Sequence, residues 1–171
     1  MAGPGNSARS VASMAGGSYS RGMTEKSLSA RVGAPAFHKL WLKVAAVVVG
    51  SFGPVFFLGA AGVVEPARLT LDVLSWPVDG ATTYESPDTR FLSALTGGFL
   101  AGWGVTIWLL SELLYDVAPE AVRRTVVYGI CTWFLLDSAG SYLSGNGSNV
   151  LFNIAVLLIA VGPLWRPAKA Q

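Results

Sequence analysis

Four long apolar runs occupy most of the chain from Trp41 onward, and nearly all charged residues lie between them. Their lengths are close to the roughly 17–25 residues that a helix needs to cross a bilayer core. Lipid cannot hydrogen-bond to the backbone, so each run must satisfy its own amides, as a helix does. We therefore predict an all-α membrane protein, a four-transmembrane-helix bundle. The predicted spans are residues 41–64, 91–114, 125–143 and 149–165.

Composition agrees with a membrane protein. Hydrophobic residues make up 52% of the 171 residues and charged residues 13%, whereas soluble proteins contain about 25% charged residues. A soluble bundle would show a polar face in every turn, but segments 44–49 and 154–161 contain no polar residue. The net charge of +2 is too small to indicate a nucleic-acid partner. The lipid bilayer is the expected surrounding of the chain.

The basic residues predict the orientation. If the chain crosses four times, every Lys and Arg except Arg68 and Arg90 lies on one side. By the positive-inside rule, both termini are then on the inner side of a bacterial inner membrane or of an organelle inner membrane. Glu112 and Asp116 are predicted to face Arg123 and Arg124 at this inner rim.

The first forty residues differ from the transmembrane domain, residues 41–167. Segment 1–40 is rich in Gly, Ser and Arg and lacks apolar periodicity. It is typical of a flexible basic tail that orients the first span. An organelle transit segment is the alternative, because such segments are also rich in Arg and Ser and poor in acids.

The outer link, residues 64–90, contains a short amphipathic piece ending at Trp76. Its apolar residues favour a helix that lies in the outer interface and packs against the bundle. A functional lid is the alternative interpretation.

Small residues in the second span predict a close helix contact. They recur four residues apart, a spacing that lets two membrane helices approach closely. The contact partner could lie in this chain or in another subunit. The residues are Gly97, Gly98, Ala101 and Gly102.

A polar layer is predicted in the outer half of the membrane, centred on Asp137. Three spans place polar side chains at similar depth there, and Asp137 lies roughly 9 Å below the outer boundary at 1.5 Å per residue. A carboxylate at such a depth is costly unless it is paired or neutral. The residues of the layer are Arg90, Ser93, Thr96, Asp137, Ser141, Asn149 and Asn153.

Two interpretations of the layer remain open. In the first, Ser, Thr and Asn side chains, and an ion pair with Arg90, hold Asp137 in place and set the helix register. In the second, the layer lines an outward-facing pocket or a proton-responsive site, because intramembrane ionisable residues are often functional.

Several chemistries are excluded by the residues available. Cys131 is the single cysteine, so no CxxC redox centre exists. His38 is the single histidine and precedes the first span, which excludes bis-histidine haem, a histidine-based metal site and a Ser–His pair in the membrane. We expect no cofactor, no metal and no enzymatic activity.

The segments 90–104, 133–141 and 161–165, and the outer motif Ser75-Trp76-Pro77-Val78-Asp79-Gly80, resemble a group of small bacterial four-span membrane proteins of no established activity. The resemblance covers about residues 41–167 and implies a membrane location, without a reaction or ligand. We expect an accessory or structural subunit that contacts other membrane protein subunits. The alternative is a small-solute or proton-responsive binding or transport protein that uses the layer around Asp137.

Overall fold

The computed structural model describes residues 36–168, so most of the predicted segment 1–40 lies outside the described residues. The described part is helical and contains no strand. The helices from His38 onward belong to one compact unit. In chain order they are the first helix Ala36–Ala60, α2 Glu65–Ser75, α3 Pro87–Leu109 with its π-helical continuation η1 Leu110–Leu114, α4 Pro119–Leu143, α5 Ser148–Val161 and the 3-10 turn η2 Gly162–Trp165.

Local signals in the sequence define where these helices begin and end. α3 begins after Ser86, whose hydroxyl accepts a hydrogen bond from the amide of Asp88, and Pro87 occupies its first turn. The first helix stops at Ala60, four residues before the predicted end of the first span, because Gly62 has a φ of 101°. That left-handed conformation suits glycine and turns the chain toward α2.

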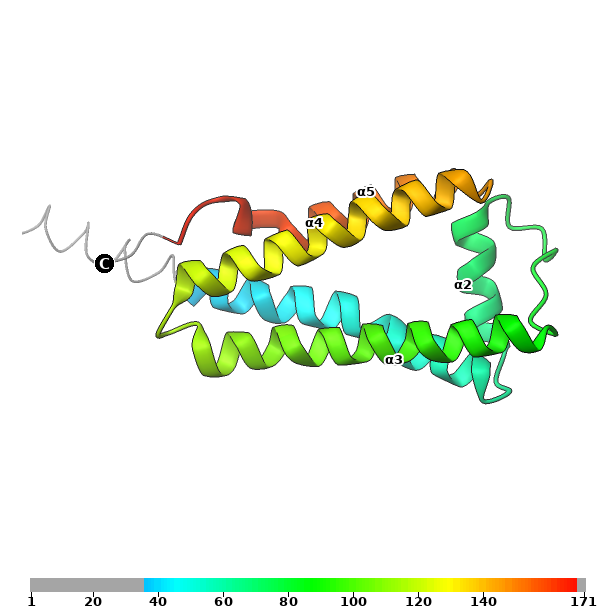
Figure 1. Cartoon of the computed structure of the whole chain (residues 1–171), viewed down its shortest axis with the longest axis horizontal. Coiled ribbons are helices and arrows are strands. Elements are labelled where there is room, and N and C mark those ends of the chain that lie inside the picture. The colour runs from blue at the N-terminus through cyan, green and yellow to red at the C-terminus, as the bar shows by residue number, and fades with distance from the viewer. Residues whose placement is uncertain (1–35, 169–171) are drawn as a thin grey trace, which may run out of the picture. The chain divides into compact units, whose positions relative to one another are not determined.

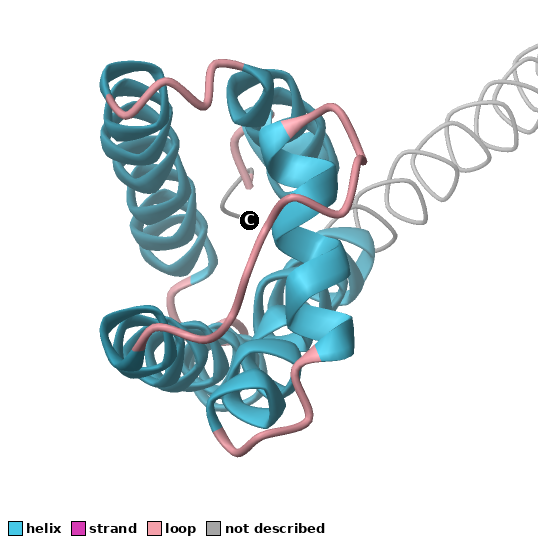
Figure 2. Ribbon diagram, turned by 90° about the vertical axis from the view of Figure 1, so that its right-hand side faces the viewer, coloured by secondary structure: helices cyan, strands magenta, loops and turns pink. Residues whose placement is uncertain are grey.

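The long helices alternate in direction, and α2 crosses them at one end (Figure 1). α4 and α5 lie side by side, whereas α3 packs on the first helix (Figures 1 and 2). α2 connects the two pairs, since Ser148 at the start of α5 donates a hydrogen bond to the carbonyl of Leu74 at 2.7 Å. The connections formed by residues 76–86 and 144–147 both lie at this α2 end (Figure 1).

Three helices are long and apolar enough to cross a membrane: Ala36–Ala60, Pro87–Leu114 and Ser148–Trp165. They fit a membrane protein. α4, with 25 residues, has the length of a span but is not among the three. Asp137, Ser138 and Ser141 make its second half more polar than the other long helices. Length and composition thus support three of the four predicted spans.

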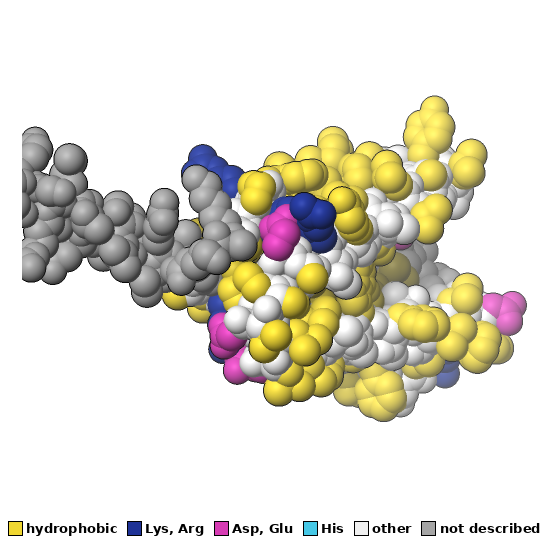
Figure 3. Space-filling view, turned by 60° about the vertical axis from the view of Figure 1, so that its left-hand side comes forward, with side chains coloured by type: hydrophobic (Ala, Val, Ile, Leu, Met, Phe, Trp, Pro, Cys, Tyr) yellow, Lys and Arg dark blue, Asp and Glu magenta, His cyan; other side chains and the backbone are white. Residues whose placement is uncertain are grey.

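Large apolar side chains cover the outside of the long helices, as expected for a surface that faces lipid. Phe99, Leu136 and Leu151 are each more than 70% exposed although they lie well inside α3, α4 and α5. Figure 3 shows apolar side chains across one face, with the charged ones confined to a few groups. A soluble monomer rarely exposes apolar surface this extensively.

Glycines bring the first helix and α3 into backbone contact. A Cβ added at Gly104 would lie 2.6 Å from the Cα of Gly50, and one added at Gly97 would lie 2.8 Å from the carbonyl oxygen of Gly53. Ala101 completes this contact, since a Cβ at Gly53 would lie 2.7 Å from the Cβ of Ala101. Close approach of this kind is how helices gain packing energy in lipid.

The predicted contact through Gly98 and Gly102 is not made within residues 36–168. A Cβ added at either position meets no atom within 4 Å. Gly97 and Ala101 from the same stretch do make the predicted contact. The two pairs point in different directions, because successive residues on a 3.6-residue helix are rotated by about 100° about its axis. Gly97 and Ala101 therefore face the first helix, whereas Gly98 and Gly102 do not.

Candidate functional site

A cavity of about 420 Å³ lies between α3 and the α4–α5 pair. Two buried apolar clusters meet around it: Val49 and Ile130 come from the larger cluster, and Phe56 and Tyr84 from the smaller one beneath α2. The volume falls within the roughly 300–1,000 Å³ that is usual for small-molecule sites. All five helices contribute to its lining.

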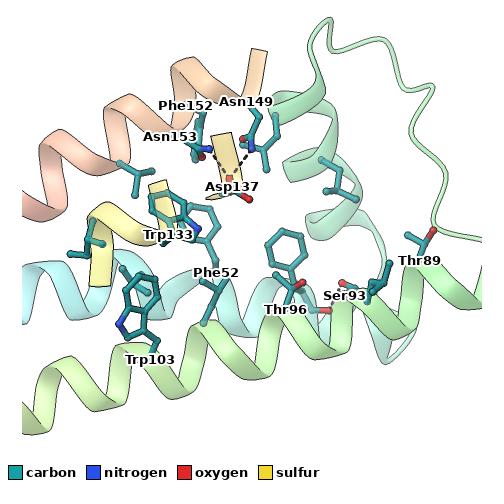
Figure 4. Close-up of a pocket in the computed structure, with 18 of the residues that line it drawn as sticks. Phe52, Thr89, Ser93, Thr96, Trp103, Trp133, Asp137, Asn149, Phe152 and Asn153 are labelled. Atoms are coloured by element: carbon teal, nitrogen blue, oxygen red, sulfur yellow. Dashed lines mark hydrogen bonds between the residues drawn. The ribbon is translucent and has the colours of Figure 1, made fainter. Parts of the chain in front are cut away.

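One wall of the cavity carries a polar cluster built on Asp137. Asn153 and Asn149 each donate a hydrogen bond from their amide nitrogen to Asp137 Oδ2, at 2.6 and 3.1 Å (Figure 4). The same two nitrogens also donate to Ser138 Oγ at 3.2 Å and Ser141 Oγ at 2.8 Å. The structure thus brings together four members of the predicted polar layer and adds Ser138, which sequence reasoning did not include.

The opposite wall, on α3, carries Ser93 and Thr96. The hydroxyl of Ser93 donates to the carbonyl of Phe56 at 3.0 Å and shares a second hydrogen bond with the hydroxyl of Tyr84. Ser93 therefore joins the first helix, α3 and the loop after α2. Thr96 also lines the cavity, facing the Asp137 wall (Figure 4).

Arg90 does not pair with Asp137, so the ion pair considered from the sequence is wrong. Its Nε donates to the backbone carbonyl of Tyr84 at 3.0 Å, which directs the guanidinium to the loop. No ion pair among residues 36–168 includes Asp137. The α-helical register places Arg90 one turn before Ser93, and only the folded loop determines which group it meets.

Aromatic side chains make up much of the remaining lining. Phe52 and Phe152 pack edge to face with ring centroids 6.1 Å apart, and Trp133 lies one turn before Asp137 on α4. Trp103 lines the cavity from α3 (Figure 4). Aliphatic residues complete a largely apolar interior in which the Asp137 cluster is the principal polar feature. The aliphatic lining residues are Val49, Leu71, Leu74, Leu92, Leu100, Ile130 and Val156.

α2 covers one end of the cavity through Leu71 and Leu74. Its position depends on Asp72, which is 1% exposed and accepts hydrogen bonds from the amides of Gly80 and Thr82 and from Arg68. The Thr82 side chain, followed by these amides and Arg68, holds the pKa of Asp72 below its usual value despite burial. The predicted amphipathic piece is therefore a helix, and a buried carboxylate that sequence reasoning missed ties it to the loop.

The predicted partners at the other end of the bundle are wrong. Asp116 pairs with Lys39 at 2.7 Å and Glu112 pairs with Lys43, whereas both had been expected to face Arg123 and Arg124. The basic collar of the first helix packs beside the end of α3, which brings these charges together. A π-helical turn adjoins them, and its buried Ser111 donates to the carbonyl of Lys39 at 3.1 Å.

Arg123 and Arg124 instead bind Glu120, one turn earlier on α4. Hydrogen bonds from Arg123, and secondarily from Arg124 and the amide of Ala168, lower the pKa of Glu120 to about 2. Arg123 also donates to the carbonyl of Leu164 at 2.6 Å. This cluster joins the start of α4 to the C-terminal segment and lies outside the cavity.

No group of three or more His, Cys, Asp or Glu side chains that could hold a metal occurs within residues 36–168. Cys131 is half-buried and free. Neither a protein-family profile, nor a curated protein, nor a solved structure matches this chain.

Proposed function

We propose that this protein is a four-span, non-enzymatic membrane protein, with both termini on the inner side, that binds a small and largely apolar ligand. The cavity that contains the Asp137 cluster carries this proposal. Its volume, its aromatic lining and its few converging polar groups are the usual features of a binding site for a small molecule. An ionisable residue at membrane depth is a further indication of function.

The chemistry of the lining residues supports the non-enzymatic part of this proposal. General acid–base catalysis needs a titratable group whose pKa suits the proton transfer, and nucleophilic catalysis needs a base beside the nucleophile. Asp137 is the one carboxylate among the described lining residues, and its neighbours Asn149 and Asn153 do not titrate. Ser93 donates to the backbone carbonyl of Phe56 and shares a hydrogen bond with the hydroxyl of Tyr84, and its partners among the described residues include no histidine, lysine or carboxylate.

Four spans are supported by the course of the chain. α3, α4 and α5 alternate in direction, and the loops before and after α4 lie at opposite ends of the bundle. If α4 did not cross the membrane, these two loops would have to lie on the same side. The polar residues in the second half of α4 that bind Asn149 and Asn153 rather than facing lipid are Asp137, Ser138 and Ser141. A helix can cross a membrane with such residues when another helix satisfies them.

Filling the cavity tests the binding proposal. Thr96→Trp adds bulk at a lining residue whose side chain has no hydrogen-bond partner among the described residues, whereas Leu95→Trp adds it at an exposed neighbour outside the lining. With octanol as the probe and empty nanodiscs as the background, calorimetry should show saturable binding to the wild type and to Leu95→Trp. Binding that persists unchanged in Thr96→Trp would contradict the proposal.

A second function, as an accessory subunit of a membrane assembly, is favoured by the open face of α3. Gly98 and Gly102 form a small-residue pair at which an added Cβ meets no atom of the described residues within 4 Å, and such pairs support association between membrane helices. Gly98→Leu should reduce co-purification of partner subunits after mild extraction without changing thermal stability. Equal co-purification by the wild type and Gly98→Leu would count against this role.

A further inference from the structure

We infer that the ligand of the cavity is a cationic amphiphile, an ammonium group with at least one N–H on an apolar body, and that the ammonium binds Asp137. This inference rests on the proposed binding function and specifies its ligand class. It starts from the two oxygens of Asp137, which have different surroundings. Both amide hydrogen bonds go to Oδ2, and Oδ1 accepts none from the described residues.

The neighbouring amides cannot serve Oδ1. Each amide nitrogen carries two hydrogens, and Asn149 and Asn153 each use their nitrogen for Asp137 Oδ2 and for one serine hydroxyl. The lone pairs of Oδ1 are thus left for a donor that enters from the cavity. The serine partners hold the amides in the orientation that makes the carboxylate their acceptor.

No cation of the described chain neutralises Asp137. Arg68 and Arg90 are the basic residues at the α2 end, and both are engaged elsewhere. Arg68 binds Glu65 and Asp72, and Arg90 binds the carbonyl of Tyr84. An ionised carboxylate in an apolar medium is costly when it lacks a partner. A ligand that brings its own positive charge removes this cost.

The lining around Asp137 suits an organic cation better than an inorganic one. Aromatic faces attract an ammonium group, and Phe52, Trp133 and Phe152 lie on the side of the cavity nearest Asp137 (Figure 4). A metal ion would need several oxygen ligands, whereas Asn149 and Asn153 present their nitrogens to the carboxylate. The aliphatic remainder of the cavity accommodates the apolar body.

The test compares octylammonium with octanol, its neutral counterpart, by calorimetry in nanodiscs of zwitterionic lipid. The wild type should bind octylammonium about tenfold more tightly than octanol, the difference expected for one desolvated charge contact. Asp137→Asn should lose this preference, and circular dichroism should verify its fold. Glu85→Gln removes an exposed acid outside the cavity and should keep the preference.

The contradicting outcomes separate this inference from the proposed function. Equal binding of both probes by the wild type, or a preference that persists in Asp137→Asn, would overturn the cationic ligand while the cavity remained a binding site. Displacement of octylammonium by sodium ions at an equal concentration would also overturn it, in favour of an inorganic cation. Failure of both probes to bind the wild type would overturn the proposed function itself.

Discussion

At the scale of the residue, Asp137 organises the wall of the cavity. Asn149 and Asn153 on α5 reach it from the neighbouring helix, so a single carboxylate joins two long helices. Hydrogen bonds of this kind matter in lipid because no water replaces them. The carboxylate therefore has a structural role whatever the cavity binds.

The first prediction concerns the contribution to stability of the hydrogen bonds that Asp137 accepts. Asp137→Asn keeps an acceptor for the two amides and should cost little stability. Asp137→Leu leaves the donors of Asn149 and Asn153 without their acceptor, and should cost about 1–3 kcal/mol more. Unfolding in mixed micelles measures the difference.

A double variant that also changes Arg90 tests whether Arg90 and Asp137 interact. Because Arg90 binds the carbonyl of Tyr84, the losses from Asp137→Asn and Arg90→Gln should add in the double variant. Rescue of one change by the other would indicate that the two side chains do interact. Equal stability of Asp137→Asn and Asp137→Leu would show that the amides do not depend on the carboxylate.

At the scale of the element, two different kinds of contact join the helices in pairs. The first helix and α3 touch through Gly50, Gly53, Gly97 and Gly104, whereas α4 and α5 are joined by the Asp137 cluster. Close van der Waals packing therefore joins the first helix to α3, and hydrogen bonds join α4 to α5. The cavity lies where the pairs face each other.

The second prediction concerns the glycine contact. Gly104→Ala places a methyl group 2.6 Å from the Cα of Gly50, and a backbone atom cannot move aside as a flexible side chain would. Overpacking of this kind should cost about 1–3 kcal/mol. The matched control is Gly102→Ala, where the added methyl meets no atom within 4 Å. Thermal unfolding in detergent should distinguish them, and equal melting temperatures would contradict the contact.

The third prediction concerns pH and the cluster at the start of α4. The folded pKa of Glu120, about 2, lies below its ordinary value of 4.5. Its stabilising contribution is therefore complete above about pH 4.5 and is lost as the pH falls toward 2. Glu120→Gln should flatten that part of the pH–stability profile, measured by thermal unfolding. A slope that Glu120→Gln leaves unchanged would contradict this assignment.

At the scale of the whole molecule, the alternation of helices places the loops at two ends. Residues 76–86 and 144–147 share the α2 end, and the turn at Val117 lies at the other end beside the C-terminal segment. Basic residues concentrate at the second end, which the positive-inside rule assigns to the inner side. In the topology that we propose, the α2 end with its cavity faces outward.

The fourth prediction tests this topology in a Cys131→Ala background. Cysteines at Glu85 and Ser144, both exposed at the α2 end, should react with an impermeant thiol reagent added from outside. A cysteine at Val117, which is 83% exposed, should react only after the membrane is opened. Reaction of Val117→Cys and Ser144→Cys from the same side would mean that α4 does not cross.

The helical class, the approximate extent of the long helices and four of the five residues of the Asp137 cluster could be predicted from the sequence. These features depend on local patterns: the length of an apolar run, a Pro or Gly at a helix end, and the depth of a polar side chain along its own helix. Gly97 and Ala101 were recognised in the same way, because their spacing is a property of one helix. Asp137, Asn149 and Asn153 could be grouped because their depths coincide.

Which side chains contact one another depends on how the helices and loops pack in three dimensions. Rotation of a helix about its axis placed Gly97 against the first helix and left Gly98 open, although both fit the same motif. Arg90 binds a backbone carbonyl in the loop after α2. Asp72 is buried because residues 80–82 fold back over it. The cavity exists because the two helix pairs lie apart from each other. A distance between segments that are far apart in the sequence produces no periodic pattern of residues.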